Sequence, residues 1–208
     1  MIKIDKMCLG MYSTNCYIVR REESDECLVF DPADSGKYIY DTLREKGFKV
    51  AGIFITHGHF DHLYGVDELR NLSGAKVYAG REEEKLLSDE RLNCSLQMGR
   101  VVKVTPDIFL RDGEEINLAG IKVKAIETPG HTIGSVSFYI EEAASIIVGD
   151  LIFLESVGRT DLPTGSMKTL VQTAKEKILT LPDKTRIYPG HGGTTTVGNE
   201  KDYNPFLS

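Results

Sequence analysis

The chain has 208 residues, of which 41% are hydrophobic and 27% charged, and these proportions are those of a globular protein rather than a disordered one. Its formal net charge of −6 and the absence of any run of Lys or Arg exclude an electrostatic footprint for nucleic acid. The N-terminal residues MIKIDKMCLG lack the apolar stretch of a signal peptide, and no segment reaches the ~20 apolar residues of a membrane span, so we expect a cytoplasmic protein with no membrane partner.

The first half of the chain predicts strands followed by alternating helices and strands. The β-rich stretches are residues 2–9, 15–20 and 27–30. Ser35 opens a helix that runs through Lys46 and stops at Gly47. The apolar, branched run at 50–55 predicts a buried strand, and the motif THGHFDH begins directly after it. This half ends with a helix at 65–72, a strand at 76–78 and an exposed, Glu/Lys-rich helix at 81–87.

The second half repeats this alternation. The predicted strands are residues 114–117, 121–127, 135–140 and 146–148. A helix at 166–179 follows, with Ser166 as its N-cap, and a last short strand covers 186–188. Because no linker or low-complexity stretch divides the chain, we predict one domain over residues 1–208, a mixed α/β domain with sheets inside and helices outside.

The four cysteines show no CxxC spacing and mostly fall in strand-like apolar stretches. They are Cys8, Cys16, Cys27 and Cys94. We therefore expect buried, reduced thiols rather than disulfides or zinc ligands.

All five histidines of the chain fall in three short motifs, each directly after a predicted strand. They are His57, His59 and His62 in THGHFDH, His131 in TPGHT, and His191 in YPGHG. Asp61 lies within the first motif, and Asp150 follows another predicted strand. Imidazole and carboxylate donors without thiolate fit zinc, iron and manganese alike. Four possible ligands lie within six residues of the first motif, and such a set can bind two metals more easily than one.

These motifs, in this order and with this spacing, resemble those of the metallo-β-lactamase fold superfamily. The resemblance covers residues from about 12 to 205. It implies a four-layer αββα sandwich, in which two sheets lie back to back with helices on the outer faces and the metals lie at one edge.

Position by position, the resemblance also implies a set of seven ligands. His57, His59 and His131 would hold the first metal, Asp61, His62 and His191 the second, and Asp150 would bridge the two. We expect two divalent ions, zinc first, with iron and manganese as alternatives. Two such ions roughly 3.5–4 Å apart can share a water and lower its pKa from ~15.7 towards ~7. The catalytic residues would be Asp61, which takes a proton from that water or orients it, and Asp150.

Within the superfamily, the tracts GDLIF and GRTD look like those of the glyoxalase II group, the hydroxyacylglutathione hydrolases. This resemblance implies hydrolysis of a small-molecule acyl thioester, S-lactoylglutathione or a related hydroxyacyl thioester, with no protein nucleophile. Arg159 would contact the substrate, and the alternative for Arg159 is an ion pair with Asp161. Tyr12 and Asn15 are candidates either for the pocket mouth or for a core or turn role.

Several alternatives stay open at this level. A mononuclear-iron sulfur dioxygenase would use part of the same ligand set, and a lactonase would share the mechanism. Antibiotic hydrolysis is disfavoured, because the β-lactamases of this fold lack the bridging aspartate that Asp150 supplies here. The longer glyoxalase II enzymes carry a C-terminal helical domain for glutathione that has no counterpart in this chain, so the thiol carrier is open, as is the oligomeric state.

Overall fold

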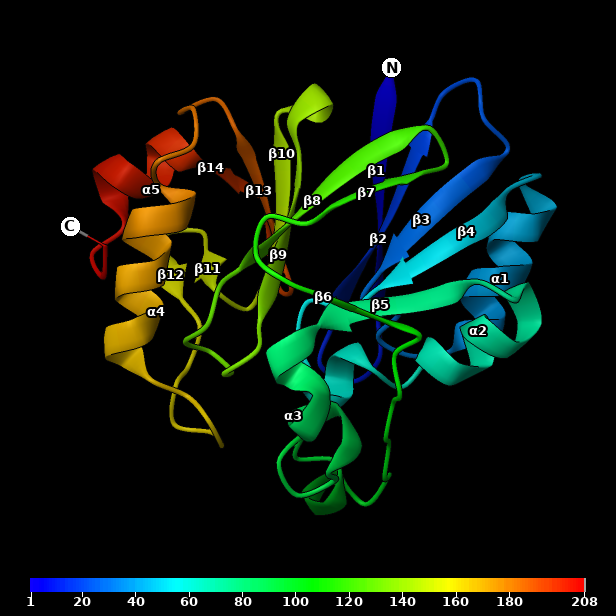
Figure 1. Cartoon of the computed structure of the whole chain (residues 1–208), viewed down its shortest axis with the longest axis horizontal. Helices are drawn as coiled ribbons and strands as arrows, with labels where there is room; N and C mark the ends of the chain where they lie inside the picture. The colour runs from blue at the N-terminus through cyan, green and yellow to red at the C-terminus, as the bar shows by residue number, and fades with distance from the viewer. Residues whose placement is uncertain (208) are drawn as a thin grey trace.

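In the computed structural model, which describes residues 1–207, two six-stranded β-sheets face each other and helices cover their outer sides (Figure 1). The first sheet has the order β1 (Ile2–Leu9), β2 (Thr14–Arg21), β3 (Glu26–Phe30), β4 (Lys49–Phe54), β5 (Lys76–Gly80), β6 (Ile108–Leu110). The second has the order β14 (Thr195–Thr196), β13 (Arg186–Pro189), β10 (Ser145–Gly149), β9 (Val136–Ile140), β8 (Ile121–Glu127), β7 (Glu115–Leu118). A separate small hairpin pairs β11 (Ile152–Phe153) with β12 (Ser156–Val157).

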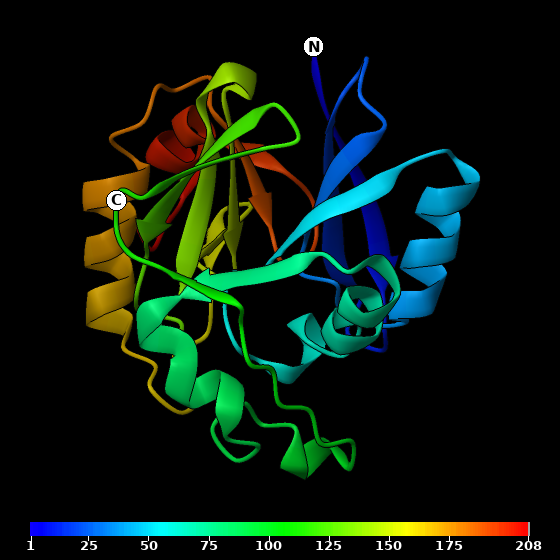
Figure 2. The ribbon, with the colours of Figure 1, turned by 45° about the vertical axis from the view of Figure 1, so that its right-hand side comes forward.

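Helices lie on both outer faces, as Figures 1 and 2 show. On the first sheet these are α1 (Gly36–Glu45) and α2 (Val66–Ser73), which connect the parallel strands β3, β4 and β5. On the second sheet they are α4 (Met167–Thr173) and α5 (Val197–Tyr203). The short α3 (Glu84–Ser88) lies at the lower end of the sheets in both views.

Three buried hydrophobic clusters hold the four layers together. Between the two sheets, the inward faces of their strands meet around the aromatic rings of Phe30, Phe54 and Phe138. The outer face of the first sheet packs against α1 and α2, and the outer face of the second packs against α4 and α5. Because both faces of each sheet are covered, the central strands β3, β4 and β10 are almost continuously apolar in sequence. The predicted αββα sandwich is confirmed.

The ten predicted strands are all present, each within two residues of its predicted bounds. Ser166 caps α4 through its side chain, which accepts a hydrogen bond from the Thr169 amide, as predicted. The helix predicted over 166–179 changes character after Thr173, where a π-helical turn covers Ala174–Ile178. Ser35, by contrast, precedes α1 in a left-handed conformation and its side chain makes no cap.

The prediction of an exposed helix over 81–87 is wrong in one respect. The segment is a 3₁₀ turn (Arg81–Glu83) followed by α3, and the side chains of Glu83, Leu86 and Leu87 on its inner face are buried. The Glu/Lys-rich sequence of this segment does not reveal the buried face, because only one of its three consecutive glutamates turns inward.

Three of the cysteines are buried and free as expected, and Cys8 is free but exposed. Cys8 lies near the end of β1, an edge strand of the first sheet, which leaves its thiol uncovered. Within residues 1–207, no helix combines the length and the apolar character needed to cross a membrane.

Candidate metal centre

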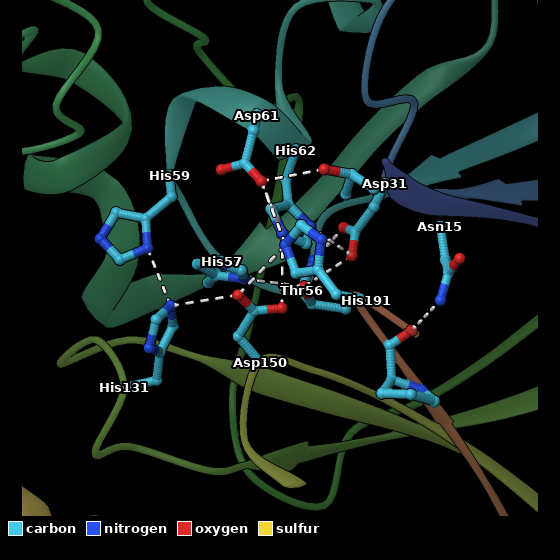
Figure 3. A network of polar contacts seen from close by, with 12 residues as sticks. Asn15, Asp31, Thr56, His57, His59, Asp61, His62, His131, Asp150 and His191 are labelled. Atoms are coloured by element: carbon cyan, nitrogen blue, oxygen red, sulfur yellow. Dashed lines mark hydrogen bonds and ion pairs between the residues drawn. The ribbon is translucent and has the colours of Figure 1, made fainter. Parts of the chain in front are cut away.

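The seven predicted ligands come together where the loops that follow four strands meet (Figure 3). The first motif follows β4, His131 follows β8, Asp150 follows β10 and His191 follows β13. Their potential ligand atoms form three overlapping groups, and within each group all atoms lie within 4.8 Å of one another. The groups are His57, His59 and His131; Asp61, His62 and His191; and Asp150 with His57 and His62.

This grouping separates the same two triads that the family resemblance implies for two metals. Asp150 has one neighbour from each triad in its own group. Its two carboxylate oxygens face different histidines: Oδ1 lies 3.5 Å from His62 Nε2, and Oδ2 lies 3.7 Å from His131 Nε2 and 3.5 Å from His191 Nε2. A carboxylate in this position can serve both triads.

In four of the histidines, Nδ1 donates a hydrogen bond to a partner outside the cluster. His131 Nδ1 lies 2.7 Å from the Arg159 carbonyl oxygen, and His191 Nδ1 lies 3.1 Å from that of Tyr12. Because a carbonyl only accepts hydrogen bonds, both nitrogens carry the proton, and the lone pair of each neutral ring is on Nε2.

The same holds for the two other histidines. His62 Nδ1 donates to the carboxylate of Asp31 at 3.0 Å. Thr56 Oγ1 uses its own proton on Asp31, so it accepts from His57 Nδ1 at 3.1 Å. These outer contacts fix ring orientation and tautomer, as the partners of metal-bound histidines commonly do.

Several inward-facing atoms have no partner. His57 Nε2, His62 Nε2 and Asp150 Oδ1 are buried and have no hydrogen-bond partner among the described residues. His59 differs, because its Nδ1 faces the cluster, 2.9 Å from His131 Nε2 (Figure 3). A buried polar atom left unsatisfied costs about 1–3 kcal/mol, so three of them in one cluster call for a compensating group. Imidazole nitrogens and carboxylate oxygens at this spacing fit divalent cations.

The protonation states of the cluster point the same way. Burial lowers the pKa of His131 and lowers that of His59 to about 3, which keeps both rings neutral. Burial alone would raise the pKa of Asp150, but the His62 ring beside it lowers that pKa well below its usual range. His191 has its pKa lowered by burial and raised more strongly by the hydrogen-bonded Asp150, to about 10. The ionised carboxylates therefore draw positive charge into the centre of the cluster.

Asp31 is the residue of this site that the sequence does not single out. It follows β3 with a φ of +48°, a left-handed conformation that a non-glycine residue rarely adopts. From there its buried carboxylate accepts the Thr56 amide at 2.7 Å, the Thr56 hydroxyl at 2.7 Å and His62 Nδ1. The available sequence signal was an Asp-Pro pair directly after a strand, which is also typical of an ordinary turn.

Glu83 is a second such residue, and it ties two ligand loops together. Its Oε1 accepts the amide of Gly58, between His57 and His59, at 2.7 Å, and its Oε2 accepts the amide of Gly134 at 2.8 Å. Gly134 lies three residues beyond His131. The side chain is only 1% exposed, so the loops of the first triad share one buried acceptor.

A cavity of about 360 Å³ opens onto the ligands, and two of the three remaining candidate residues line it. Arg159 and Tyr12 line this cavity. The Arg159 guanidinium also makes a bidentate pair with Asp161, at 2.7 Å for both bonds, and both side chains are exposed. Asn15 is buried instead and donates to the Pro189 carbonyl oxygen at 2.9 Å, so it braces the loop that carries His191 rather than lining the cavity.

A family profile described as Metallo-beta-lactamase superfamily matches residues 9–191 of the chain. The chain belongs to this superfamily. Among its curated relatives, the "Probable metallo-hydrolase YqgX" of Bacillus subtilis is 39% identical over 209 residues, which cover 100% of this chain and 98% of the relative. The "Hydroxyacylglutathione hydrolase GloC" of Haemophilus influenzae is 30% identical, covering 100% and 99%. The superfamily match and these relatives identify a metal-dependent hydrolase, as the motifs predict.

Solved structures of the superfamily show the same fold. The crystal structure of the BLEG-1 B3 metallo-beta-lactamase has a TM-score of 0.93 at 35% identity, with both chains covered completely. The crystal structure of TTHA1623 in a di-iron-bound form has a TM-score of 0.87 at 32% identity, covering 98% of this chain and all of the other. The His/Asp cluster thus lies in a fold whose members hold metals, including iron in that case.

Proposed function

We propose that the chain hydrolyses hydroxyacyl thioesters, with S-lactoylglutathione the first substrate to test, and that the seven clustered residues hold two divalent cations for this reaction. The observation that carries the proposal is the pair of His/Asp triads joined by Asp150, with unsatisfied nitrogens facing inward. The relative named hydroxyacylglutathione hydrolase supports the substrate class. Zinc is the first candidate metal, and iron and manganese are alternatives that the same donors accept.

The first triad, His57, His59 and His131, would hold one cation, and Asp61, His62 and His191 the other, with Asp150 shared. When bound, two such cations supply a Lewis acid for the thioester carbonyl and a water of lowered pKa. The chain's own residues orient the reactants around them and bring no nucleophile. The group that leaves when the C–S bond breaks is a thiolate, which is weakly basic, so its departure needs no protein acid.

We assign to Asp61 the role of accepting a proton from the attacking water. Its Oδ2 accepts a hydrogen bond from Thr14 Oγ1 at 2.9 Å and lies 3.2 Å from His191 Nε2. These contacts hold the carboxylate in one orientation at the wall of the cavity. His62 beside it lowers its pKa against the effect of burial, so the carboxylate is ionised and free to accept a proton.

Arg159 is our candidate for contact with the substrate, because it lines the cavity that the ligands face. Its pair with Asp161 is bidentate but exposed, and water and salt screen an exposed pair, so an acceptor oxygen of the substrate can compete for the guanidinium. The guanidinium fork suits such an acceptor.

The experiment is metal analysis combined with turnover of S-lactoylglutathione, a second hydroxyacyl thioester, a lactone and a β-lactam. The variants are Asp150→Ala and, as a matched control, Asp183→Ala, whose carboxylate pairs with Lys201 at the surface. We expect Asp150→Ala to lose one or both metals and thioester turnover to fall on the order of 10²-fold or more. Asp183→Ala should match the wild type.

Each other outcome favours a different function. Unchanged thioester turnover in Asp150→Ala overturns the two-cation site. One iron per chain with oxygen consumption identifies a sulfur dioxygenase, and turnover confined to the lactone identifies a lactonase. The structural likeness to BLEG-1 makes β-lactam hydrolysis a further candidate, which the presence of Asp150 disfavours.

A further inference from the structure

A second cavity, of about 340 Å³, adjoins the cavity of the metal ligands, and we call it the Tyr12 pocket. Three residues line both cavities: Tyr12, Phe60 and Asp61. The Tyr12 and Phe60 rings meet edge to face with centroids 5.1 Å apart. The two cavities therefore adjoin at these three residues, of which Asp61 belongs to the ligand cluster.

The walls of the Tyr12 pocket are apolar and adaptable. They include Leu9, Met11, Tyr12, Phe60, Tyr64 and Met98. Three of these side chains are large, apolar and exposed: Met11 at 95%, Tyr12 at 48% and Met98 at 42%. Exposed apolar side chains gathered around a hollow are typical of a binding site, and thioethers beside aromatic rings adapt to ligands of varied shape.

The charges in the pocket disfavour an anionic ligand. Of the described residues that line it, Arg100 is the one with a positive charge, and Asp34 already holds its guanidinium at 3.0 and 3.1 Å. The Arg100 guanidinium also stacks over the Tyr64 ring, 4.1 Å from its centroid. With Asp61 at the inner end, the lining carries two carboxylates against one cation. Asp34 already neutralises Arg100, so a ligand carboxylate would enter a lining whose charges sum to −1.

We infer that the Tyr12 pocket binds the thiol half of the thioester and selects an uncharged, flexible arm of alkyl and amide character. This inference rests on the proposed function, since it places the reacting carbonyl in the metal-side cavity. A hydroxyacyl group is short and stays within that cavity, whereas the thiol half is longer and has to extend past it. The Tyr12 pocket adjoins that cavity and has apolar walls, so it is where we place the thiol half.

The test measures binding without turnover, using two thioethers that replace the thioester carbonyl by CH₂: S-(2-hydroxypropyl)pantetheine, which is uncharged, and S-(2-hydroxypropyl)glutathione, which is anionic. Both are titrated into the metal-loaded protein by calorimetry. The variant is Met98→Lys, in the pocket wall. The matched control is Leu96→Lys, because Leu96 is 48% exposed, belongs to the same 3₁₀ turn (Leu96–Met98) and does not line the pocket.

We expect the wild type to bind the pantetheine thioether about tenfold more tightly than the glutathione thioether, a difference of ~1.4 kcal/mol. Met98→Lys should remove or reverse this preference, and Leu96→Lys should keep it. The inference is overturned if Met98→Lys leaves both affinities unchanged, or if the wild type prefers the anionic thioether. Thioester turnover is measured in parallel, and its absence counts against the proposed function, whereas these affinities alone decide on the pocket.

Discussion

The carboxylate of Asp31 accepts the Nδ1 proton of His62 at 3.0 Å, and both side chains are fully buried. Asp31 also fixes Thr56, whose hydroxyl in turn orients His57. One carboxylate outside the cluster thus aligns one histidine of each triad.

Asp31→Asn should weaken metal binding more than it weakens folding. The Thr56 amide donates to Oδ1 of Asp31, and the Thr56 hydroxyl and His62 Nδ1 both donate to Oδ2. An amide has one acceptor oxygen, so its NH₂ group would face the donors on one of these two sides, and loss of such a partner typically costs 10–100-fold in metal affinity or activity. Competition with a chromophoric chelator measures the affinity. Asp25→Asn, at an exposed pair with Lys49, is the matched control. Equal affinities in the two variants would show that Asp31 does not orient the rings.

Glu83→Gln should loosen the loops of the first triad. The carboxamide places an N–H group against one of the two amides, of Gly58 and Gly134, that the carboxylate accepts, and an unsatisfied buried donor costs about 1–3 kcal/mol. We expect the chain to bind one metal more weakly than the other, seen as a two-step release during chelator titration. The neighbouring exposed Glu82→Gln controls for the change of charge. A single-step release identical to that of the control contradicts this prediction.

Gly190→Ala should displace Asp150. A Cβ at Gly190 would lie 2.1 Å from Asp150 Oδ1 and 2.7 Å from His62 Cε1, so the Asp150 carboxylate has to move. At Gly193, a few residues further along, a Cβ meets nothing within 4 Å. We expect Gly190→Ala to lose metal and Gly193→Ala to retain it, by elemental analysis of the folded proteins. Full metal content in Gly190→Ala would mean that the loop yields without disturbing Asp150.

Removal of metal should lower thermal stability. A ligand present at 1,000 times its Kd stabilises a protein by about 4 kcal/mol, which corresponds to roughly 10 °C in Tm for a chain of this size. Calorimetry before and after chelation, and again after metal is restored, measures the change. Chelator saturated with zinc beforehand should leave the Tm unaltered. If the metal-free protein melts at the same temperature, the inward nitrogens need no cation for stability.

The seven-residue cluster could be predicted from the sequence because its members lie in compact motifs at strand ends. Strand positions followed equally from apolar runs. The parts that could not be predicted depend on distant contacts. Glu83 is one of three consecutive glutamates, and only the packing of α3 decides which of them turns inward. The Tyr12 pocket likewise brings Tyr12 and Met98 together across 86 positions of sequence, with the hydroxyl 3.0 Å from the sulfur.

The backbone and the side chain of Tyr12 make different contacts. Its backbone carbonyl oxygen accepts a hydrogen bond from His191 Nδ1, whereas its side chain lines both cavities. Replacement of the side chain therefore leaves the acceptor for His191 in place. With the thiol arm in the Tyr12 pocket, as we infer, substrate preference could change at Tyr12, by natural variation or by design, while His191 keeps its backbone partner.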